Sequence, residues 1–288
     1  MFADRFISAT QQYGPLCLGL DPHAGRIPDI FGGDTAEGIL QWGKAILNAA
    51  QGRVGVVKPQ IALFERHGWQ GLKTLSYLSS YAKSLGFIVL MDAKRGDIGS
   101  TAAGYAAAYL GRQAPFVCDA LTVNPYMGVE TLDPFMQAAE ANGKGLIVLA
   151  RTSNPGSADF QTQACDGVPL YTRVVKKLAP LIARLEGQSG WSGLMLVAGA
   201  TGPEEARALR QNAPTALFLV PGYGAQGADA RAAVAGFVKG QGGCVNASRS
   251  LTFPAGSDTA TRLTDWQDKV CAAIEAAQSD LVAALRHA

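Results

Sequence analysis

The sequence has few of the residues that build metal sites, disulfide frameworks or membrane spans. Its three histidines are scattered, and its five cysteines form neither a CxxC pair nor a Cys/His cluster. We therefore expect reduced thiols, without a structural zinc site or a disulfide framework. No apolar run approaches the roughly 20 residues that span a bilayer. Charged residues interrupt Met1–Ile7, where a signal peptide would need an apolar region, so we expect a soluble, cytoplasmic protein.

An excess of charge of one sign is also missing. The formal net charge is +2, which gives no indication of nucleic acid or an anionic membrane as a partner. Hydrophobic residues make up 48% and charged residues 17% of the chain, a composition that supports a large core and argues against disorder. The length suits one large α/β domain or two small ones. Since no linker is visible, we expect residues 1–288 to form a single domain.

Eight short apolar runs recur along the chain, each ending in polar or glycine-rich residues. Near-continuous apolar runs are typical of strands buried on both faces of a parallel sheet. Because segments with helical spacing separate them, the pattern predicts an α/β fold, a (β/α)8 TIM barrel. An open doubly wound sheet, which usually has fewer strands, is the alternative. The expected strands are Leu16–Asp21, Val54–Lys58, Phe87–Lys94, Ala120–Asn124, Gly145–Arg151, Gly193–Ala198, Ala216–Pro221 and Cys244–Ser248.

Two of the expected helices have clear sequence signals. One begins at Pro203, with acidic residues in its first turn and Thr201 as its expected cap. The last helix carries an apolar stripe that we expect to pack on the barrel, made of Trp266, Val270, Ile274, Leu281 and Leu285.

The third run ends abruptly in charged residues. Asp92 and Lys94 are two positions apart and so face the same side of a strand, whereas Asp97 follows Gly96 and is expected on a loop. Lys58 ends a valine-rich strand and either extends to solvent or meets a carboxylate such as Asp92, and we favour the second. A purely structural ion pair is the alternative. Gathering two aspartates near one lysine is, however, costly without a functional reason.

Other polar residues at the predicted strand ends are candidates of the same kind, because barrel enzymes place their chemistry there. Asp21 and Asn124 precede prolines and could instead cap turns, which is the interpretation we favour for Asn124. The remaining candidates are Arg151, Ser153, Thr201, Gln226 and Arg249.

Three loops complete the predicted mouth of the barrel. The long irregular stretch Ser153–Val168 has the length of a functional lid. The loops Gly222–Gly227 and Asn246–Ser250 follow the seventh and eighth strands, where TIM barrels frequently bind phosphate. Glycines let backbone N–H groups approach an oxyanion, while Gln226 offers an amide and Arg249 a planar fork. The residues therefore indicate an enzyme for a phosphorylated small molecule, without naming the reaction.

The segment Asp92–Ile98 resembles the DxKxxDI signature of the orotidine 5′-phosphate decarboxylase family. The similarity covers nearly the whole barrel, and the sequence around the signature is similar to the type 2, mostly bacterial, subfamily. Gly99-Ser100 departs from the Pro-Asn of many members, and the stretch from about Ser157 to Val168 has no clear counterpart. The further matching positions are Leu18–Asp21, Val57-Lys58, Thr101, Ser153–Pro155, Pro221-Gly222, Gln226 and Arg249.

This resemblance implies decarboxylation of orotidine 5′-monophosphate to UMP and CO₂, the last step of de novo pyrimidine synthesis, by a homodimer without cofactor or metal. Lys94 would protonate C6, Asp92 would lie against the leaving carboxylate, and Lys58 would hold the charge array and contact the ribose. Asp97 would reach the site from the partner subunit. The implied substrate-binding residues are Asp21 and the partner's Thr101 for ribose, Ser153 for the pyrimidine, Gln226 and Arg249 for phosphate, and Pro221.

Two other functions remain open. Sister enzymes such as 3-keto-gulonate 6-phosphate decarboxylase or hexulose phosphate synthase share DxKxxD, but they use Mg²⁺ and carry acidic residues at the second strand. The cation Lys58 at that position would repel a metal. A catalytically inactive phosphate-binding barrel that acts as a sensor is the other alternative, against which the intact charge array argues.

Overall fold

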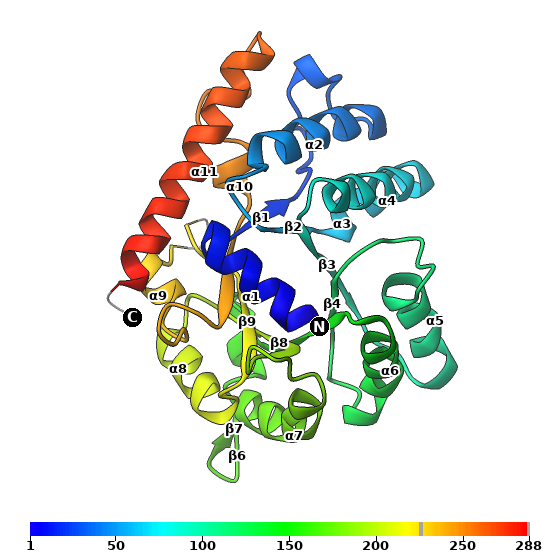
Figure 1. The fold of residues 1–288 in the computed structure, drawn as a ribbon, viewed down its shortest axis with the longest axis vertical. Helices are drawn as coiled ribbons and strands as arrows, with labels where there is room; N and C mark the ends of the chain where they lie inside the picture. Colours follow the sequence, from blue (N-terminus) through cyan, green and yellow to red (C-terminus); the bar gives the residue numbers. More distant parts are fainter. Residues whose placement is uncertain (225–226, 287–288) are drawn as a thin grey trace.

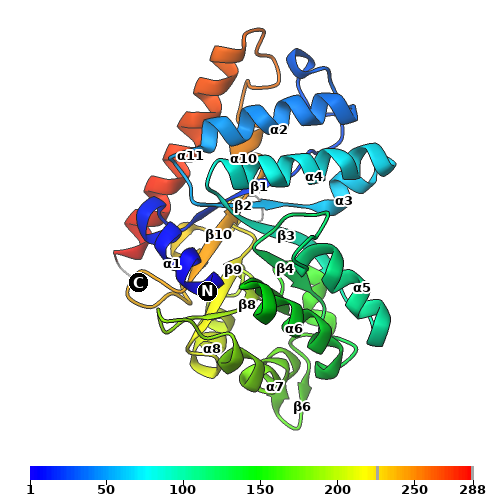
Figure 2. The same cartoon turned by 45° about the vertical axis from the view of Figure 1, so that its right-hand side comes forward.

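The computed structural model describes residues 1–224 and 227–286. Its centre is a closed barrel of parallel strands, in the order β1-β10-β9-β8-β5-β4-β3-β2 (Figures 1 and 2). The (β/α)8 prediction is confirmed, and each expected strand end lies within two residues of the observed one. The strands are β1 Leu16–Leu20, β2 Val56–Pro59, β3 Ile88–Arg95, β4 Ala120–Val123, β5 Gly145–Arg151, β8 Ser192–Ala198, β9 Ala216–Val220 and β10 Gly243–Ala247.

Helices between the strands form the outer layer of the barrel (Figure 1). The α-helices are α1 Phe2–Tyr13, α2 Ala36–Ala50, α3 Ile61–Glu65, α4 Gly68–Ser84, α5 Gly99–Leu110, α6 Asp133–Asn142, α7 Leu170–Arg184, α8 Pro203–Asn212, α9 Ala230–Ala233, α10 Arg249–Thr252 and α11 Leu263–Leu285. Short 3₁₀ turns are η1 Asp29–Phe31, η2 Val129–Leu132 and η3 Pro155–Asp159. None of these helices combines the length and the apolarity that a membrane span needs.

The two predicted helix signals have different outcomes. The stripe on α11 is confirmed, since its residues are buried apart from Leu285, which is partly buried against the core. Thr201 as a cap of α8 is wrong: the residue before the helix is Gly202, and the Thr201 hydroxyl donates to the carbonyl of Ser153 at 3.2 Å. The threonine therefore connects the loop after β8 to the loop after β5.

The inside of the barrel is apolar in its lower part and polar at its mouth. Alternate residues of each strand point inward, and at the amino-terminal end they pack against Phe2 and Phe6 of α1. Two positions further along the same face stand Lys58, Asp92 and Thr122. The inward apolar residues are Cys17, Val56, Ile88, Leu90, Ala120, Ile147, Met195, Val197, Leu217, Leu219 and Cys244.

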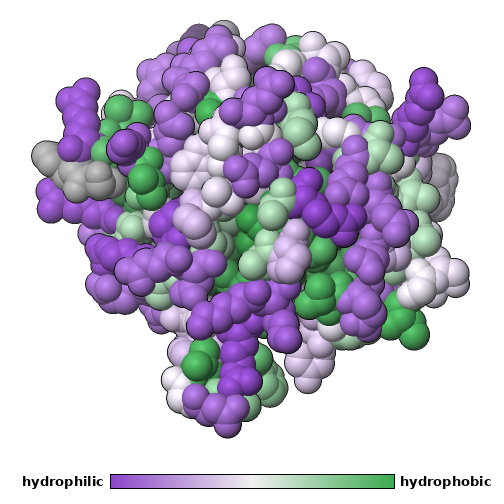
Figure 3. All heavy atoms as spheres, turned by 60° about the horizontal axis from the view of Figure 1, so that its bottom comes forward, coloured by the Kyte–Doolittle hydropathy of each residue, from purple (hydrophilic) through white to green (hydrophobic). Residues whose placement is uncertain are grey.

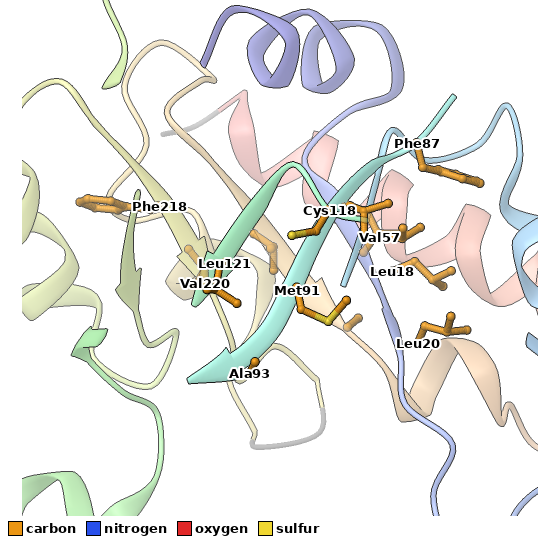
Figure 4. Packing of buried hydrophobic residues seen from close by; sticks show 14 of the residues in the cluster. Leu18, Leu20, Val57, Phe87, Met91, Ala93, Cys118, Leu121, Phe218 and Val220 are labelled. Atoms are coloured by element: carbon orange, nitrogen blue, oxygen red, sulfur yellow. The ribbon is translucent and has the colours of Figure 1, made fainter. Parts of the chain in front are cut away.

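The outward faces of the strands are equally buried, because the helices cover them. Figure 4 shows residues of this outer cluster, among them Leu18, Val57, Met91 and Leu121. Burial on both faces is why the strands read as continuous apolar runs in the sequence.

A buried arginine stabilises the connection around β9. The Arg210 guanidinium donates hydrogen bonds to backbone carbonyls at the ends of three segments, including Gly236 at 2.8 Å and Gly242 at 3.0 Å. It lies over the rings of Trp191 and Phe218, at 4.9 and 3.9 Å from their centroids. Burial lowers the pKa of Arg210 to about 9, and its charge is compensated by carbonyl dipoles and aromatic faces rather than by a carboxylate.

The loop predicted as irregular between Ser153 and Val168 is partly ordered. It contains η3 and one strand of a short antiparallel hairpin, β6 Ala164–Cys165 with β7 Val168–Pro169. Asp166 and Gly167, with φ of 51° and 74°, form its two-residue turn. The molecular face turned forward in Figure 3 is mainly hydrophilic, with hydrophobic atoms visible in recesses between polar ones.

Candidate active site

The site is organised around the carboxylate of Asp92 at the end of β3. Lys58 Nζ and Gln60 Nε2 donate to Oδ2, each at 2.9 Å. Lys94 Nζ donates to Oδ1 at 2.7 Å and the Thr122 hydroxyl at 3.0 Å. The predicted contact of Lys58 with a carboxylate and the shared face of Asp92 and Lys94 are thus confirmed. The carboxylate is held from three strand ends, so its orientation is fixed before any ligand binds.

The Asp92–Lys58 pair is charged although it is buried. Burial alone would raise the pKa of the Asp92 carboxyl, but the two lysines outweigh that effect and hold it well below its usual range. Burial would likewise lower the pKa of Lys58, yet attraction to Asp92 and Asp21 raises it instead. At neutral pH the mouth of the barrel therefore holds an ionised carboxylate between two ammonium groups.

Lys94 differs from Lys58 in exposure and in backbone conformation. Its side chain is 47% exposed, against 6% for Lys58. Its φ of 49° lies in the left-handed region, which costs a residue with a side chain on the order of 1–3 kcal/mol. The pairing of β3 with β4 is irregular there, because the register passes from Met91↔Leu121 to Arg95↔Val123. The surrounding structure must compensate this strain for the lysine to turn back onto Asp92.

Two partners of Asp92, Gln60 and Thr122, were missed by the sequence reasoning. Gln60 directly follows β2 and forms a bridge with Asp92. Thr122 is a single polar residue in the short apolar run Ala120–Val123, in step with the inward-facing Ala120. This parity was the signal that could have placed Thr122 in the mouth of the barrel.

A cavity of about 210 Å³ opens over this array. One wall is charged and polar, with Lys58, Asp92, Lys94 and Thr122. The remaining lining is Leu149, Val197, Leu219, Pro221 and the loop residues Thr152, Ser153 and Asn154. A larger hollow of about 580 Å³ lies between α2, α4 and α11 and contains none of the strand-end residues, so the smaller cavity is the candidate site. An apolar wall facing a fixed array of charges can hold a small ligand that has both an apolar and an ionic part.

The loop that brings Ser153 to this cavity is closed by its own side chains. Gln161 accepts from the backbone N–H of Thr152 at 2.8 Å and donates to its hydroxyl at 2.9 Å. Arg151 donates to the carbonyl of Thr152 at 2.7 Å and to the hydroxyl of Ser157. Gln161 and Ser157 fall in the stretch that the sequence left unassigned, and they position Ser153 rather than line the cavity.

Asp97 and Thr101 lie outside the array. Asp97 follows the end of β3, as expected of a loop residue, and its carboxylate accepts from the N–H of Ile98 at 2.8 Å. Thr101 is exposed in the first turn of α5. Ile98, next to Asp97 in the chain, is 62% exposed, and Tyr126, in the loop after β4, is 83% exposed, which is unusual for large apolar side chains.

Asn124 and Asp21, the two residues that could cap turns, differ in how they use their side chains. Asn124 caps a turn as favoured, because its side chain accepts from the N–H of Tyr126 at 3.0 Å. Asp21 uses its backbone carbonyl for the turn, accepting from His23 at 2.8 Å. Its buried Oδ1 has no hydrogen-bond partner in the described part of the chain, and the same holds for Asn246 Oδ1 and Ser248 Oγ on β10 and beside it. This side of the mouth offers polar atoms to a ligand.

The predicted phosphate residues are only partly described. Arg249 is exposed at the start of α10, and Gly222 and Gly224 adopt left-handed φ of 103° and 69° in the loop after β9. Gln226 lies outside the described residues. Among the residues that are described, no three His, Cys, Asp or Glu side chains gather in an arrangement that would hold a metal ion.

Comparison with known proteins gives consistent relatives. Residues 14–261 match the model of the "Orotidine 5'-phosphate decarboxylase / HUMPS family". An orotidine 5′-phosphate decarboxylase of Rhodopirellula baltica is 37% identical over 94% of this chain and 96% of its own length. One from Deinococcus radiodurans is 40% identical over 84% and 85%. The crystal structure of a putative orotidine 5′-phosphate decarboxylase from Streptomyces avermitilis has a TM-score of 0.84 at 34% identity, covering 99% and 96% of the two chains.

Proposed function

Because this chain belongs to the orotidine 5′-phosphate decarboxylase / HUMPS family, we propose that the array around Asp92 carries out its chemistry. The reaction is the decarboxylation of orotidine 5′-monophosphate to UMP and CO₂, the last step of UMP biosynthesis, and the enzyme is a carboxy-lyase. The observation that carries the proposal is the carboxylate of Asp92, fixed by four side chains beside a cavity with an apolar wall.

The proposed step breaks the bond between C6 of the pyrimidine and its carboxylate. CO₂ leaves, and the electron pair of the broken bond stays on C6. The substrate carboxylate lies against ionised Asp92, so their repulsion is relieved as CO₂ departs. The Lys94 ammonium stabilises the negative charge on C6 and then donates a proton to it, which yields UMP. Solvent returns a proton to the lysine, which is half-exposed for that purpose.

The other residues bind and orient the substrate. Lys58 holds Asp92 ionised and contacts the ribose, together with the unpaired Oδ1 of Asp21. Ser153 meets the pyrimidine edge, and Arg249, Gln226 and Pro221 bind at the phosphate end. Binding energy from the phosphate, remote from the reacting bond, contributes to the chemical step by holding the loops in place.

The proposed enzyme is a homodimer in which Asp97 and Thr101 complete the partner's site. Both residues stand apart from the array of their own chain, at the edge of the mouth. The exposed Ile98 and Tyr126, with Met127 at 45% exposure, supply apolar surface there that a second copy of the chain would cover.

We further propose a cytoplasmic protein, a single functional domain over residues 1–288, and membership of the type 2 subfamily.

Buried Lys58 supports a reaction without a metal. It stands 2.9 Å from Asp92, where the Mg²⁺-dependent sister enzymes would need acidic ligands, and its ammonium would repel the ion. The proposal therefore includes no cofactor.

The test is incubation with orotidine 5′-monophosphate in EDTA while the pyrimidine absorbance is followed. We expect turnover that EDTA leaves unchanged, and its abolition in Lys94→Ala with UMP binding retained. Strict dependence on Mg²⁺ would assign the chain to a sister enzyme. Normal UMP binding without turnover by the parent protein would point to a sensor.

The shared site is tested by mixing two inactive variants, Asp97→Ala and Lys94→Ala. Hybrid dimers contain one site in which both lesions fall together and one in which neither does, so part of the activity returns. If hybrids form, as shown by mass spectrometry, and remain inactive, the site is not shared between subunits.

A further inference from the structure

We infer that the hydroxyl of Thr122 is the positioning group that holds Lys94 in its reactive conformation. The threonine is 1% exposed on β4, and it belongs to the wall of the cavity beneath Lys94. This inference rests on the proposed role of Lys94 as proton donor.

The hydroxyl uses its complete hydrogen-bonding capacity on the end of β3. It accepts from the backbone N–H groups of Ala93 and Lys94, both at 2.8 Å. It donates to Asp92 Oδ1 at 3.0 Å, in preference to the more distant carbonyl of Met91 at 3.4 Å. A hydroxyl offers two lone pairs and one proton, so each is used within the array.

These two N–H groups are the ones that lose regular ladder partners at the irregular part of the sheet. Between the pairs Met91↔Leu121 and Arg95↔Val123, β3 contains two more residues than β4. The side-chain oxygen of Thr122 replaces the missing backbone acceptors, because buried N–H groups without an acceptor are costly. The hydroxyl of Thr122 therefore stabilises the widened strand in this conformation.

The same irregularity determines where Lys94 points. Its φ of 49° turns the side chain back, so that Nζ reaches Asp92 Oδ1 at 2.7 Å, the oxygen to which Thr122 donates. One hydroxyl thus fixes both ends of the Asp92–Lys94 pair, the lysine through its backbone and the carboxylate directly. Without it, we expect the left-handed backbone at Lys94 to lose its support and the ammonium to lose its fixed position against Asp92 Oδ1.

The experiment compares three substitutions. Thr122→Val keeps the shape and removes the hydroxyl, whereas Thr122→Ser keeps the hydroxyl and removes a methyl group. Thr131→Val is the matched control, because Thr131 is also buried and donates to the carbonyl of Gly128 at 2.7 Å, outside the array. For each variant, kcat on orotidine 5′-monophosphate, the Kd for UMP and the Tm are measured.

We expect Thr122→Val to lower kcat by about ten- to hundredfold, the effect of a lost hydrogen bond to a charged or strained group. The UMP Kd should stay within about twofold, because the loss falls on the chemical step rather than on binding. Thr122→Ser should restore most of the activity, and Thr131→Val should lower the Tm without lowering kcat.

Several results would overturn the inference. These are equal kcat in the valine and serine variants, or a UMP affinity that falls in proportion to kcat. If Thr122→Val does not fold, Thr122→Ala is measured in its place, and failure of both to fold would show that the residue serves stability alone. Activity of the parent and of Lys94→Ala separates this inference from the proposed function. If Lys94→Ala remained active, the proposed role of Lys94 would be wrong. If Lys94→Ala were inactive and Thr122→Val fully active, only the role of Thr122 would be refuted.

Discussion

The buried pair Lys58–Asp92 should respond unequally to the removal of its two members. In Lys58→Met, the Asp92 carboxylate still accepts from Gln60, Lys94 and Thr122. In Asp92→Ala, Lys58, whose side chain is 6% exposed in the parent structure, loses its observed side-chain hydrogen-bond partner. We therefore expect Asp92→Ala to be the more destabilising substitution, although both remove the same ion pair.

The magnitudes follow from these contacts. Lys58→Met removes one charge-assisted hydrogen bond of several, a loss of about 1.5–3 kcal/mol. Asp92→Ala leaves a buried ammonium with the attraction of Asp21 but without its hydrogen-bonded carboxylate, which costs about 3–5 kcal/mol. For a chain of this size about 2–4 °C of Tm corresponds to each kcal/mol, so the expected decreases are about 3–12 °C and about 6–20 °C. The double variant Lys58→Met/Asp92→Ala should lose less than the sum of the two single losses, since it removes both charges and leaves neither one alone.

Thermal unfolding followed by circular dichroism at neutral pH measures these differences. Arg262→Met is the control, because its ion pair with Asp265 is exposed and its removal should leave the Tm unchanged. A larger loss for Lys58→Met than for Asp92→Ala would contradict the reasoning. Strict additivity in the double variant would show that the two charges do not stabilise each other.

Three further predictions concern binding, the core and pH. Arg249→Met should raise the KM for orotidine 5′-monophosphate by at least about tenfold through loss of charge-assisted contacts to phosphate, and an unchanged KM in initial-rate assays would remove Arg249 from the phosphate site. Arg210→Met leaves several buried carbonyls without a donor, so it should lower the free energy of unfolding by at least about 3 kcal/mol, measured with denaturant, while the folded protein keeps its kcat. A smaller decrease would mean that water replaces the guanidinium. Folding lowers the pKa of Asp92 and raises that of Lys58, so the pair's contribution to stability should be constant from about pH 4 to 10. Below about pH 3.9 the contribution should decrease, because the Asp92 carboxyl binds a proton in the unfolded chain. Above about pH 10.4 it should decrease as well, because Lys58 loses its proton in the unfolded chain. Urea unfolding across pH should show the alkaline decrease diminished in Lys58→Met; an undiminished decrease would assign it to other groups.

The barrel was predictable because local sequence carries the signals that define it. Most strands end where an apolar run meets a charge, a glycine or a proline, and β4 and β10 end just before the polar Asn124 and Ser248, so the expected and observed bounds nearly coincide. Parity along one strand placed Asp92 and Lys94 together, and the Asn-Pro pair at Asn124 indicated the turn that it caps. The Asp166-Gly167 dipeptide was a hairpin signal of the same local kind, and it could have identified β6 and β7.

What escaped prediction depends on contacts between strands that are distant in sequence. Gln60 and Thr122 reach Asp92 from β2 and β4, and no local pattern states which registers bring them within hydrogen-bonding distance. Thr201 is a residue type that often caps helices, but its hydroxyl donates instead to the carbonyl of Ser153 in the loop after β5. The left-handed conformation of Lys94 is invisible in sequence because a lysine gives no reason to expect it.

The level at which the charges stand in the barrel follows from the layer beneath them. One step lower on the same strands are Val56, Leu90 and Ala120, sealed from below by α1, where an ion pair would be desolvated without room for a substrate. One step higher, solvent would screen the charges and weaken each contact. Lys58 and Asp92 occupy the first inward position above the apolar layer, so they act in a low-dielectric site that a ligand can still enter. For this reason, moving the pair by two residues in either direction should cost the enzyme either its stability or its electrostatic strength, even with every residue type retained.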